Sequence, residues 1–143
     1  MAFAALRLGY LLAAPELVRE IRKAVLPYNL NALSQIAAEV ALEMYESDVR
    51  PQVARIVEGR EYLFSELEKI SGLWPVASQA NFMIVRSQLN PKVVFEELVK
   101  RDVLIRDVSS YPMLSEYFRF NVGTPEENEI FLRGLREILE SVS

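Results

Sequence analysis

Two arginines near the end of the chain carry the strongest chemical signal in this sequence. Arg106 and Arg119 are 13 positions apart, and each stands in a short, largely apolar run that is typical of a β-strand. A guanidinium group in an apolar strand needs an anion, because an unpaired buried charge is too costly to keep. Two such strands predict two anion sites close together.

Each arginine has a functional and a structural interpretation. Strand alternation puts Arg119 on a polar face, where its guanidinium group could hold a carboxylate through two parallel hydrogen bonds. The alternative is a cross-strand salt bridge, and by spacing alone it is the commoner outcome. Arg106 is followed by Asp107, so its alternatives are a local ion pair or an edge-strand charge that discourages aggregation.

Composition narrows the class of protein. The 143 residues are 51% hydrophobic, enough for one ordinary globular domain. The net charge of −4 is spread along the chain, so we expect neither a nucleic-acid nor a membrane partner. Twelve of the 16 basic residues are arginine, which favours planar recognition of carboxylates or phosphates.

The sequence contains neither cysteine nor histidine. Disulfides and thiolate metal sites are thereby excluded, and with them most zinc sites, the familiar nucleophile–histidine triads and the commonest general base. No metal site is predicted. Any catalytic group must therefore be a lysine, a tyrosine, a carboxylate or a bound cofactor. The apolar start is interrupted by Arg7 and has no basic leader, so we expect a cytoplasmic protein.

Hydrophobic periodicity divides the chain into a helical first half and a mixed second half. The expected elements are a buried strand at 6–13, helices at 16–26, 32–46 and 51–70, a strand at 81–86, a helix at 91–101, strands at 103–107 and 117–124, and a helix from 125 onward. A capping box should start the last helix, with Thr124 and Glu127 bonding each other's backbone. The helix at 32–46 is apolar nearly all round, which predicts contact with another domain or subunit.

Several short sequence motifs, in the order in which they occur, resemble the C-terminal part of histidinol-phosphate aminotransferases. This is a family of fold-type I enzymes that depend on pyridoxal phosphate. The first is the strand ending in Arg-Asp at 103–107, and the second is x-Arg-x-x-Val-Gly-Thr-x-Glu-Glu-Asn at 118–128. Leu6–Tyr10 resembles the Leu-Arg-x-Gly-Tyr segment that follows the cofactor-binding lysine. Ser78–Phe82 resembles a Ser-x-Ala-Asn-Phe strand start, and Tyr28–Asn31 resembles a Pro-Phe-Asn-Val loop.

The resemblance implies a fold and a division of the chain. The expected class is α/β: the C-terminal small domain of a fold-type I transferase, with helices packed on a small mixed or antiparallel sheet, preceded by a strand and helices of the large domain. Residues 1–47 would end the large, cofactor-binding domain. Residues 48–143 would form the small domain, beginning with a long connector helix.

The resemblance also implies roles for particular residues. Arg7 would bind the cofactor phosphate, Arg106 the phosphate of the substrate, and Arg119 the substrate carboxylate. Asn81 and Asn29 are weaker candidates for substrate binding, and a strand start or a loop is the structural alternative for each.

One part of the family pattern is missing from the chain. In the family the Schiff-base lysine stands shortly before the arginine that matches Arg7, so here it would fall upstream of Met1. Lys23, Lys69, Lys92 and Lys100 do not stand in a matching context. We therefore expect no catalytic residue in this chain and no transaminase activity from the chain alone.

The implied activity is amino transfer between histidinol phosphate and 2-oxoglutarate, a step of histidine biosynthesis. The partners would be a phosphorylated amino acid or amino alcohol and the 2-oxoglutarate/glutamate pair, bound to a homodimer that carries pyridoxal 5'-phosphate. One alternative is a related enzyme of the same fold, such as a threonine-phosphate decarboxylase or an aromatic aminotransferase. Another is a non-catalytic module that binds an anionic partner through the same arginines.

Overall fold

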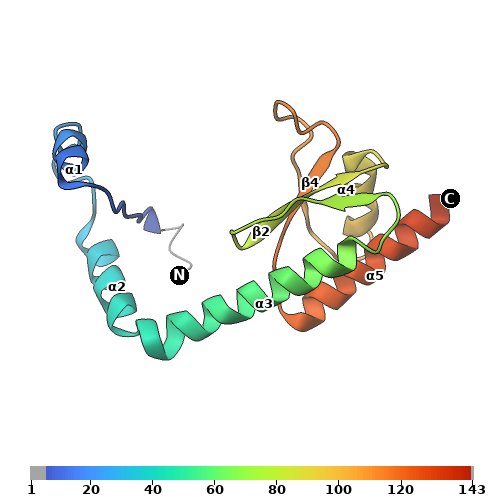
Figure 1. Cartoon of the computed structure of the whole chain (residues 1–143), viewed down its shortest axis with the longest axis horizontal. Helices are drawn as coiled ribbons and strands as arrows, with labels where there is room; N and C mark the ends of the chain where they lie inside the picture. Colours follow the sequence, from blue (N-terminus) through green and yellow to red (C-terminus); the bar gives the residue numbers. More distant parts are fainter. Residues whose placement is uncertain (1–5, 143) are drawn as a thin grey trace. The chain divides into compact units, whose positions relative to one another are not determined.

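The computed structural model describes residues 6–142, which fall into two compact units with the boundary in the sequence between Gln52 and Val53. The first unit contains α1 (Pro15–Arg22), α2 (Ala32–Glu43) and a π-helical segment (Tyr45–Val49). The second unit follows in Figure 1 from α3 onward, and its elements are α3 (Arg50–Leu67), β1 (Leu73–Pro75), β2 (Phe82–Ser87), α4 (Pro91–Val99), β3 (Arg106–Asp107), β4 (Tyr117–Asn121) and α5 (Pro125–Val142). The predicted assignment of 1–47 and 48–143 to a large and a small domain remains a prediction.

A four-stranded antiparallel sheet organises the second unit. The strand order is β1-β2-β4-β3, so the two longest strands lie in the middle and the two shortest form the edges. Met83 opposes Phe120 and Val85 opposes Phe118 across the central pair. The three-residue edge strand β1 was not expected from the sequence, and β3 is shorter than the run at 103–107 predicted.

Strand alternation gives this sheet one buried and one open face. Along β2 and β4 every second side chain is buried, and these are apolar except Ser87. Three helices supply the other side of the core. Its buried members on the helices are Leu63, Leu67, Val94, Leu98, Phe131, Leu132, Leu135, Ile138 and Leu139. The second unit is therefore a two-layer sandwich, and the opposite face of the sheet is not covered by a helix of this unit.

Helices α3 and α5 lie side by side under the sheet (Figure 1). Their polar edges are joined by a hydrogen bond between Tyr62 and Glu129 and by an ion pair of 2.7 Å between Arg136 Nη2 and Glu66 Oε2. These contacts run alongside the apolar core and fix the register of one helix against the other.

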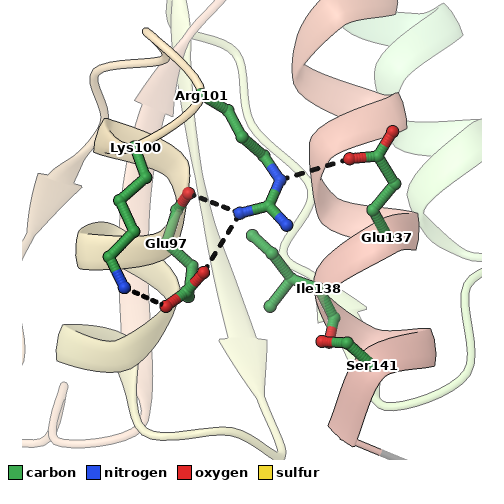
Figure 2. A network of polar contacts seen from close by, with 6 residues as sticks. All are labelled: Glu97, Lys100, Arg101, Glu137, Ile138 and Ser141. Carbon is green, nitrogen blue, oxygen red and sulfur yellow. Dashed lines mark hydrogen bonds and ion pairs between the residues drawn. The ribbon is translucent and has the colours of Figure 1, made fainter.

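A charged network joins α4 to α5, and Figure 2 shows the Arg101 guanidinium group between the two helices. Arg101 Nε donates to Glu137 Oε2 at 3.2 Å, while its Nη1 donates to the backbone carbonyl of Glu97 at 2.8 Å. Lys100 Nζ binds the Glu97 carboxylate at 2.6 Å. Hydrogen bonds from Lys100 and then Arg101 hold the pKa of the Glu97 carboxyl below its ordinary value.

The start of α5 confirms the predicted capping box. Thr124 N donates to Glu127 Oε2 at 2.8 Å, and Glu127 N donates to Thr124 Oγ1 at 3.3 Å. Asn128 adds a second tie, because its side chain bonds both the N–H and the carbonyl of Gly123. The end of β4 is thereby fastened to the first turn of α5.

The first unit corrects one expectation. The predicted buried strand at 6–13 is wrong: this segment is irregular, and Tyr10 and Leu12 are 87% and 88% exposed. A strand needs a neighbour to satisfy its backbone, and the described part of this unit contains no other strand. Helix α2 forms where a helix was expected and is capped by the Asn31 side chain, yet its apolar side chains are mostly exposed.

No helix described in residues 6–142 is both long enough and apolar enough to cross a membrane.

Candidate functional site

The open face of the sheet brings the two predicted arginines together. Arg106 on β3 and Arg119 on β4 are direct cross-strand partners, and Ile84 on β2 lies on the other side of Arg119. Directly opposed residues have their Cβ atoms about 5 Å apart, so two like charges face each other here. An anion bound between them would relieve this repulsion.

Neither arginine is neutralised within the part of the chain that the structure describes. The described residues offer Arg119 no cross-strand salt bridge and pair no carboxylate with Arg106. Asp107 turns away instead, and its Oδ1 accepts a hydrogen bond of 2.8 Å from Ser109 N. Hydrogen bonds from Ser109 hold the pKa of the Asp107 carboxyl below its ordinary value. Both structural alternatives that involve a carboxylate partner are thus absent from residues 6–142.

Arg119 is half-buried, and part of its donor set has no partner. Its Nε is buried and makes no hydrogen bond among the described residues. The guanidinium carbon lies over the ring of Phe82, 5.0 Å from the ring centroid. A buried guanidinium donor without an acceptor is the feature expected of a site that receives an anion from outside.

A second arginine–aromatic pair lies on the same face, one row further along the sheet. Arg86 on β2 opposes Trp74 on β1, and its guanidinium carbon is 4.2 Å from the Trp74 ring centroid. Tyr117 is the partner of Arg86 on β4. The open face therefore carries three arginines from three adjacent strands, and among residues 6–142 none of them forms an ion pair.

A cavity of about 790 Å³ adjoins the arginine pair at the edge of the sheet. It opens where the chain before β3 departs from β4, because β3 pairs with only two residues of that strand. Its walls combine the sheet edge, the first turn of α5 and apolar side chains, among them Ile105, Arg106, Arg119, Asn128 and Phe131. This volume suits a small organic ligand.

Asn81 lies next to the arginine face but contributes its backbone. Its carbonyl accepts a hydrogen bond of 2.9 Å from Val122 N and so extends the pairing of β2 with β4. Its side chain is exposed and makes no hydrogen bond among the described residues. A role for Asn81 in substrate binding remains a prediction.

Arg7 and Asn29 belong to the first unit and are described within it. Arg7 is exposed and has a left-handed backbone, with φ of 54°. The residue before it is held at the start of α2, because Ser34 Oγ donates to the Leu6 carbonyl at 3.0 Å. Asn29 lies in an exposed loop beside Tyr28. Binding roles for Arg7 and Asn29 remain predictions.

The donor set of this chain fits one end of a phosphorylated aldehyde cofactor. Arg7 is a guanidinium group without an ion pair among the described residues, which suits a phosphate. The lysines do not suit the aldehyde, since Lys23, Lys69 and Lys100 are exposed and paired with glutamates, and Lys92 is an exposed residue of α4. In the described part, no cluster of acidic residues could hold a metal ion.

Sequence reasoning missed the aromatic partners of the arginines. In the sequence, Phe82 was considered only as part of the Ser78–Phe82 motif, and a contact between Trp74 and Arg86 was not predicted. Alternation along 82–86 already put Phe82 and Arg86 on one face, but the register of the sheet was needed to show which arginine each ring would meet.

These features define a class of structure: a small α/β sandwich whose antiparallel sheet presents unpaired arginines on its open face. Comparison with known proteins shows to which family it belongs. The family model for aminotransferase class I and II matches residues 1–135. The chain therefore belongs to the class I and II aminotransferase family.

Its sequence relatives are histidinol-phosphate aminotransferases, which confirms the resemblance seen in the sequence. The chain is 38% identical over 143 residues to the enzyme of Aquifex aeolicus, covering 100% of this chain and 40% of the relative. It is 43% identical over 141 residues to histidinol-phosphate aminotransferase 1 of Carboxydothermus hydrogenoformans, covering 96% and 38%. The chain thus spans about two fifths of the length of these relatives.

Solved structures confirm the fold-type I assignment. The histidinol-phosphate aminotransferase of Clostridium acetobutylicum aligns with a TM-score of 0.73 at 24% identity, over 88% of this chain and 38% of that one. The enzyme of Sinorhizobium meliloti, in complex with pyridoxal-5'-phosphate, gives 0.75 at 20% identity, over 98% and 38%. L-threonine-O-3-phosphate decarboxylase from Porphyromonas gingivalis gives 0.68 at 21%, over 90% and 40%. At these identities the likeness is one of fold.

Proposed function

We propose that this chain is the C-terminal portion of a pyridoxal-phosphate-dependent aminotransferase that acts on histidinol phosphate and 2-oxoglutarate. The observation that carries the proposal is the pair formed by Arg106 and Arg119, two directly opposed arginines that form no ion pair with a carboxylate among the described residues. The relatives at 38% and 43% identity, which are histidinol-phosphate aminotransferases, supply the substrate class.

The proposed roles are those that the resemblance implies, and they agree with the charge of each arginine side chain. Arg119, in the middle of the sheet, holds the carboxylate of glutamate or 2-oxoglutarate through two parallel hydrogen bonds. Arg106, on the edge strand beside the cavity, receives the substrate phosphate. Arg7 holds the phosphate of the cofactor. Asn81 and Asn29 contribute to substrate binding less than the arginines do.

Pyridoxal phosphate, when bound, supplies the electron sink that allows an amino group to be exchanged. The part played by this chain is recognition: the guanidinium groups fix the position and plane of the substrate's anionic end, and their charge raises the local concentration of anions. The lysine that binds the cofactor would come from the remainder of the enzyme, and the complete enzyme would be a homodimer. The chain alone should therefore show no transaminase activity.

The proposal is tested in an enzyme in which this chain replaces the matching segment of the Carboxydothermus hydrogenoformans relative. We expect turnover of histidinol phosphate with 2-oxoglutarate. Arg106→Ala should reduce kcat/KM for histidinol phosphate by about 100-fold, and the value for histidinol, which lacks the phosphate, by less than about threefold, because a charge-assisted contact is worth roughly 1.5–3 kcal/mol.

Arg133→Ala is the matched control, because Arg133 is exposed on α5 and forms no ion pair among the described residues. Equal losses on both substrates with Arg106→Ala would contradict the assignment of Arg106 to the phosphate. Release of carbon dioxide from threonine phosphate without amino transfer would identify the enzyme as a decarboxylase. Phosphate binding by an enzyme without either turnover would favour a non-catalytic module.

A further inference from the structure

Among the described residues of the open face, Arg119 is the arginine that stands on a central strand and has a buried donor without a hydrogen-bond partner. Strand β4 is paired on both sides, so the backbone of Arg119 is fixed. Its side chain has no such support from charge: one cross-strand neighbour is Ile84, which is apolar, and the other is Arg106, which repels it. Something other than a carboxylate must keep this guanidinium group in place.

The ring of Phe82 is the group that does so. Its centroid is 5.0 Å from the guanidinium carbon of Arg119, within the range at which a cation is attracted to the face of an aromatic ring. Phe82 opposes Asn121, two residues beyond Arg119 on β4, so ring and guanidinium group meet as diagonal neighbours on the sheet. Within residues 6–142 this is the attractive contact that the guanidinium group of Arg119 makes.

Phe82 is itself held by the local structure. It is the first residue of β2, and its carbonyl accepts a hydrogen bond of 2.7 Å from Ser78 Oγ. The same Ser78 hydroxyl oxygen accepts from Ala80 N at 3.0 Å, which fixes the turn before the strand. The backbone that carries the ring is therefore fixed by hydrogen bonds, although the Phe82 side chain lies on the open face and the residue is 38% exposed.

A ring and a carboxylate hold an arginine with different consequences. A carboxylate would occupy N–H donors of Arg119 and neutralise its charge, whereas an aromatic ring attracts the cation without accepting those hydrogen bonds. Arg119 is thus kept in position while its charge is not neutralised and its Nε–H is not used by another acceptor among the described residues.

We propose that Phe82 is a positioning residue, whose ring holds the guanidinium group of Arg119 ready to receive the anionic group of the substrate. This inference rests on the proposed function for the identity of the substrate, but the contact on which it depends belongs to this chain. The pair formed by Trp74 and Arg86 provides an internal control, because it is the same kind of contact on the same face, away from the two opposed arginines.

The first test observes Arg119 directly in the 143-residue chain, without a ligand. In an NMR spectrum of the 15N-labelled protein, the Nε–H signal of Arg119 is assigned by its loss in Arg119→Lys. We expect this signal to be shifted by the Phe82 ring and protected from exchange with water. Phe82→Leu should remove the ring shift and speed exchange at least about fivefold, Phe82→Tyr should restore both, and Trp74→Leu should leave both unchanged.

The second test measures binding of inorganic phosphate to the same proteins. We expect Phe82→Leu to weaken binding about threefold to tenfold, whereas Phe82→Tyr and Trp74→Leu should stay within about twofold of the unsubstituted chain. Thermal unfolding of each variant shows whether it is folded. If Phe82→Leu is not, Phe82→Met, which also lacks a ring, takes its place in both tests.

The outcomes separate this inference from the proposed function. In one outcome, Phe82→Leu leaves the Arg119 NMR signal, its exchange with water and phosphate binding unchanged, while Arg119→Lys abolishes phosphate binding. Phe82 then does not position the arginine, but Arg119 is still part of an anion site. If the unsubstituted chain binds no phosphate but Phe82→Leu alters the Arg119 signal as expected, the positioning role stands and the assigned anion is wrong. An equal effect of Trp74→Leu would also overturn the inference, since the loss would then reflect the sheet as a whole.

Discussion

The two units of this chain differ sharply in how much apolar surface they bury. From Val53 onward, helices and sheet enclose a contiguous core in which Leu63, Phe118 and Leu135 are completely buried. Among the described residues up to Gln52, the one buried side chain is Ser34, a polar residue, while Leu33 and Leu42 are 77% and 64% exposed. Because burial of apolar surface is the main force in folding, stability should be concentrated in the second unit.

This contrast agrees with the fraction of its relatives' length that the chain covers. The chain covers 38% to 40% of the length of the relatives, and the exposed apolar side chains of the first unit are of the kind that pack against other parts of a protein. The second unit already contains the sheet, the core and both arginines of the candidate site. The site therefore rests on the part of the chain that has its own core.

The largest effect should come from matched truncations in the two units. Phe118→Ala should lower the free energy of unfolding by about 3–5 kcal/mol, because the side chain is fully buried and its loss leaves a cavity. Leu33→Ala removes a side chain that is 77% exposed and should change it by less than about 0.5 kcal/mol. Urea unfolding followed by circular dichroism measures both, and similar losses would show that the first unit has a core of its own.

Matched removal of helix caps should give an intermediate effect. Asn90 caps α4 by accepting a hydrogen bond of 3.0 Å from Lys92 N, and Asn31 caps α2 by accepting one of 2.9 Å from Ser34 N. Asn90→Ala should cost about 1 kcal/mol of global stability, whereas Asn31→Ala should leave global unfolding unchanged. Amide hydrogen exchange reports both, since exchange in α2 should quicken only with the second variant. A global loss from Asn31→Ala would mean that the two units unfold as one.

The smallest effect should be the contribution of Asp107 to acid stability. Its folded-state pKa lies below the ordinary value of 3.8 because of hydrogen bonds from Ser109. A lowered pKa stabilises the fold above pH 3.8, and this stabilisation is lost as the pH falls below that value through the folded-state pKa. Asp107→Asn should therefore lower Tm slightly at pH 7 and make no difference in strong acid.

Thermal unfolding across this pH range decides the point. If Asp107→Asn lowered Tm equally at neutral and acid pH, the carboxylate charge would not be the cause, and the contribution of Asp107 would be one of shape. Asp102→Asn serves as the control, because Asp102 is an exposed residue of the turn after α4.

Local patterns were sufficient for much of the second unit. Apolar residues at a period of three to four positions placed α3, α4 and α5 to within a few residues, and the capping box at Thr124 was visible as a sequence pattern. Alternation placed β2 and β4 and put Arg119 on the polar face. These features depend on contacts between residues close in the chain, so the sequence alone contains the information.

The same kind of reasoning failed where an element needed a partner. Residues 6–13 have the composition of a strand, yet a strand satisfies its backbone only by pairing, and this chain offers no neighbour in the described part of the first unit. Strand β1 was missed for the opposite reason: Leu73–Pro75 is too short to show alternation, and it becomes a strand because β2 lies beside it.

By itself, the sequence determined the family, most of the helices and strands of the second unit, and the two arginines as anion-binding candidates. Each of these depends only on residue types and on short spacings along the chain. Only the tertiary structure decided that Arg106 and Arg119 are directly opposed, that Asp107 turns away to Ser109, and that Phe82 lies beneath Arg119. The physical reason is strand register. A shift of one residue turns every side chain to the other face, and the packing of the whole core selects that register.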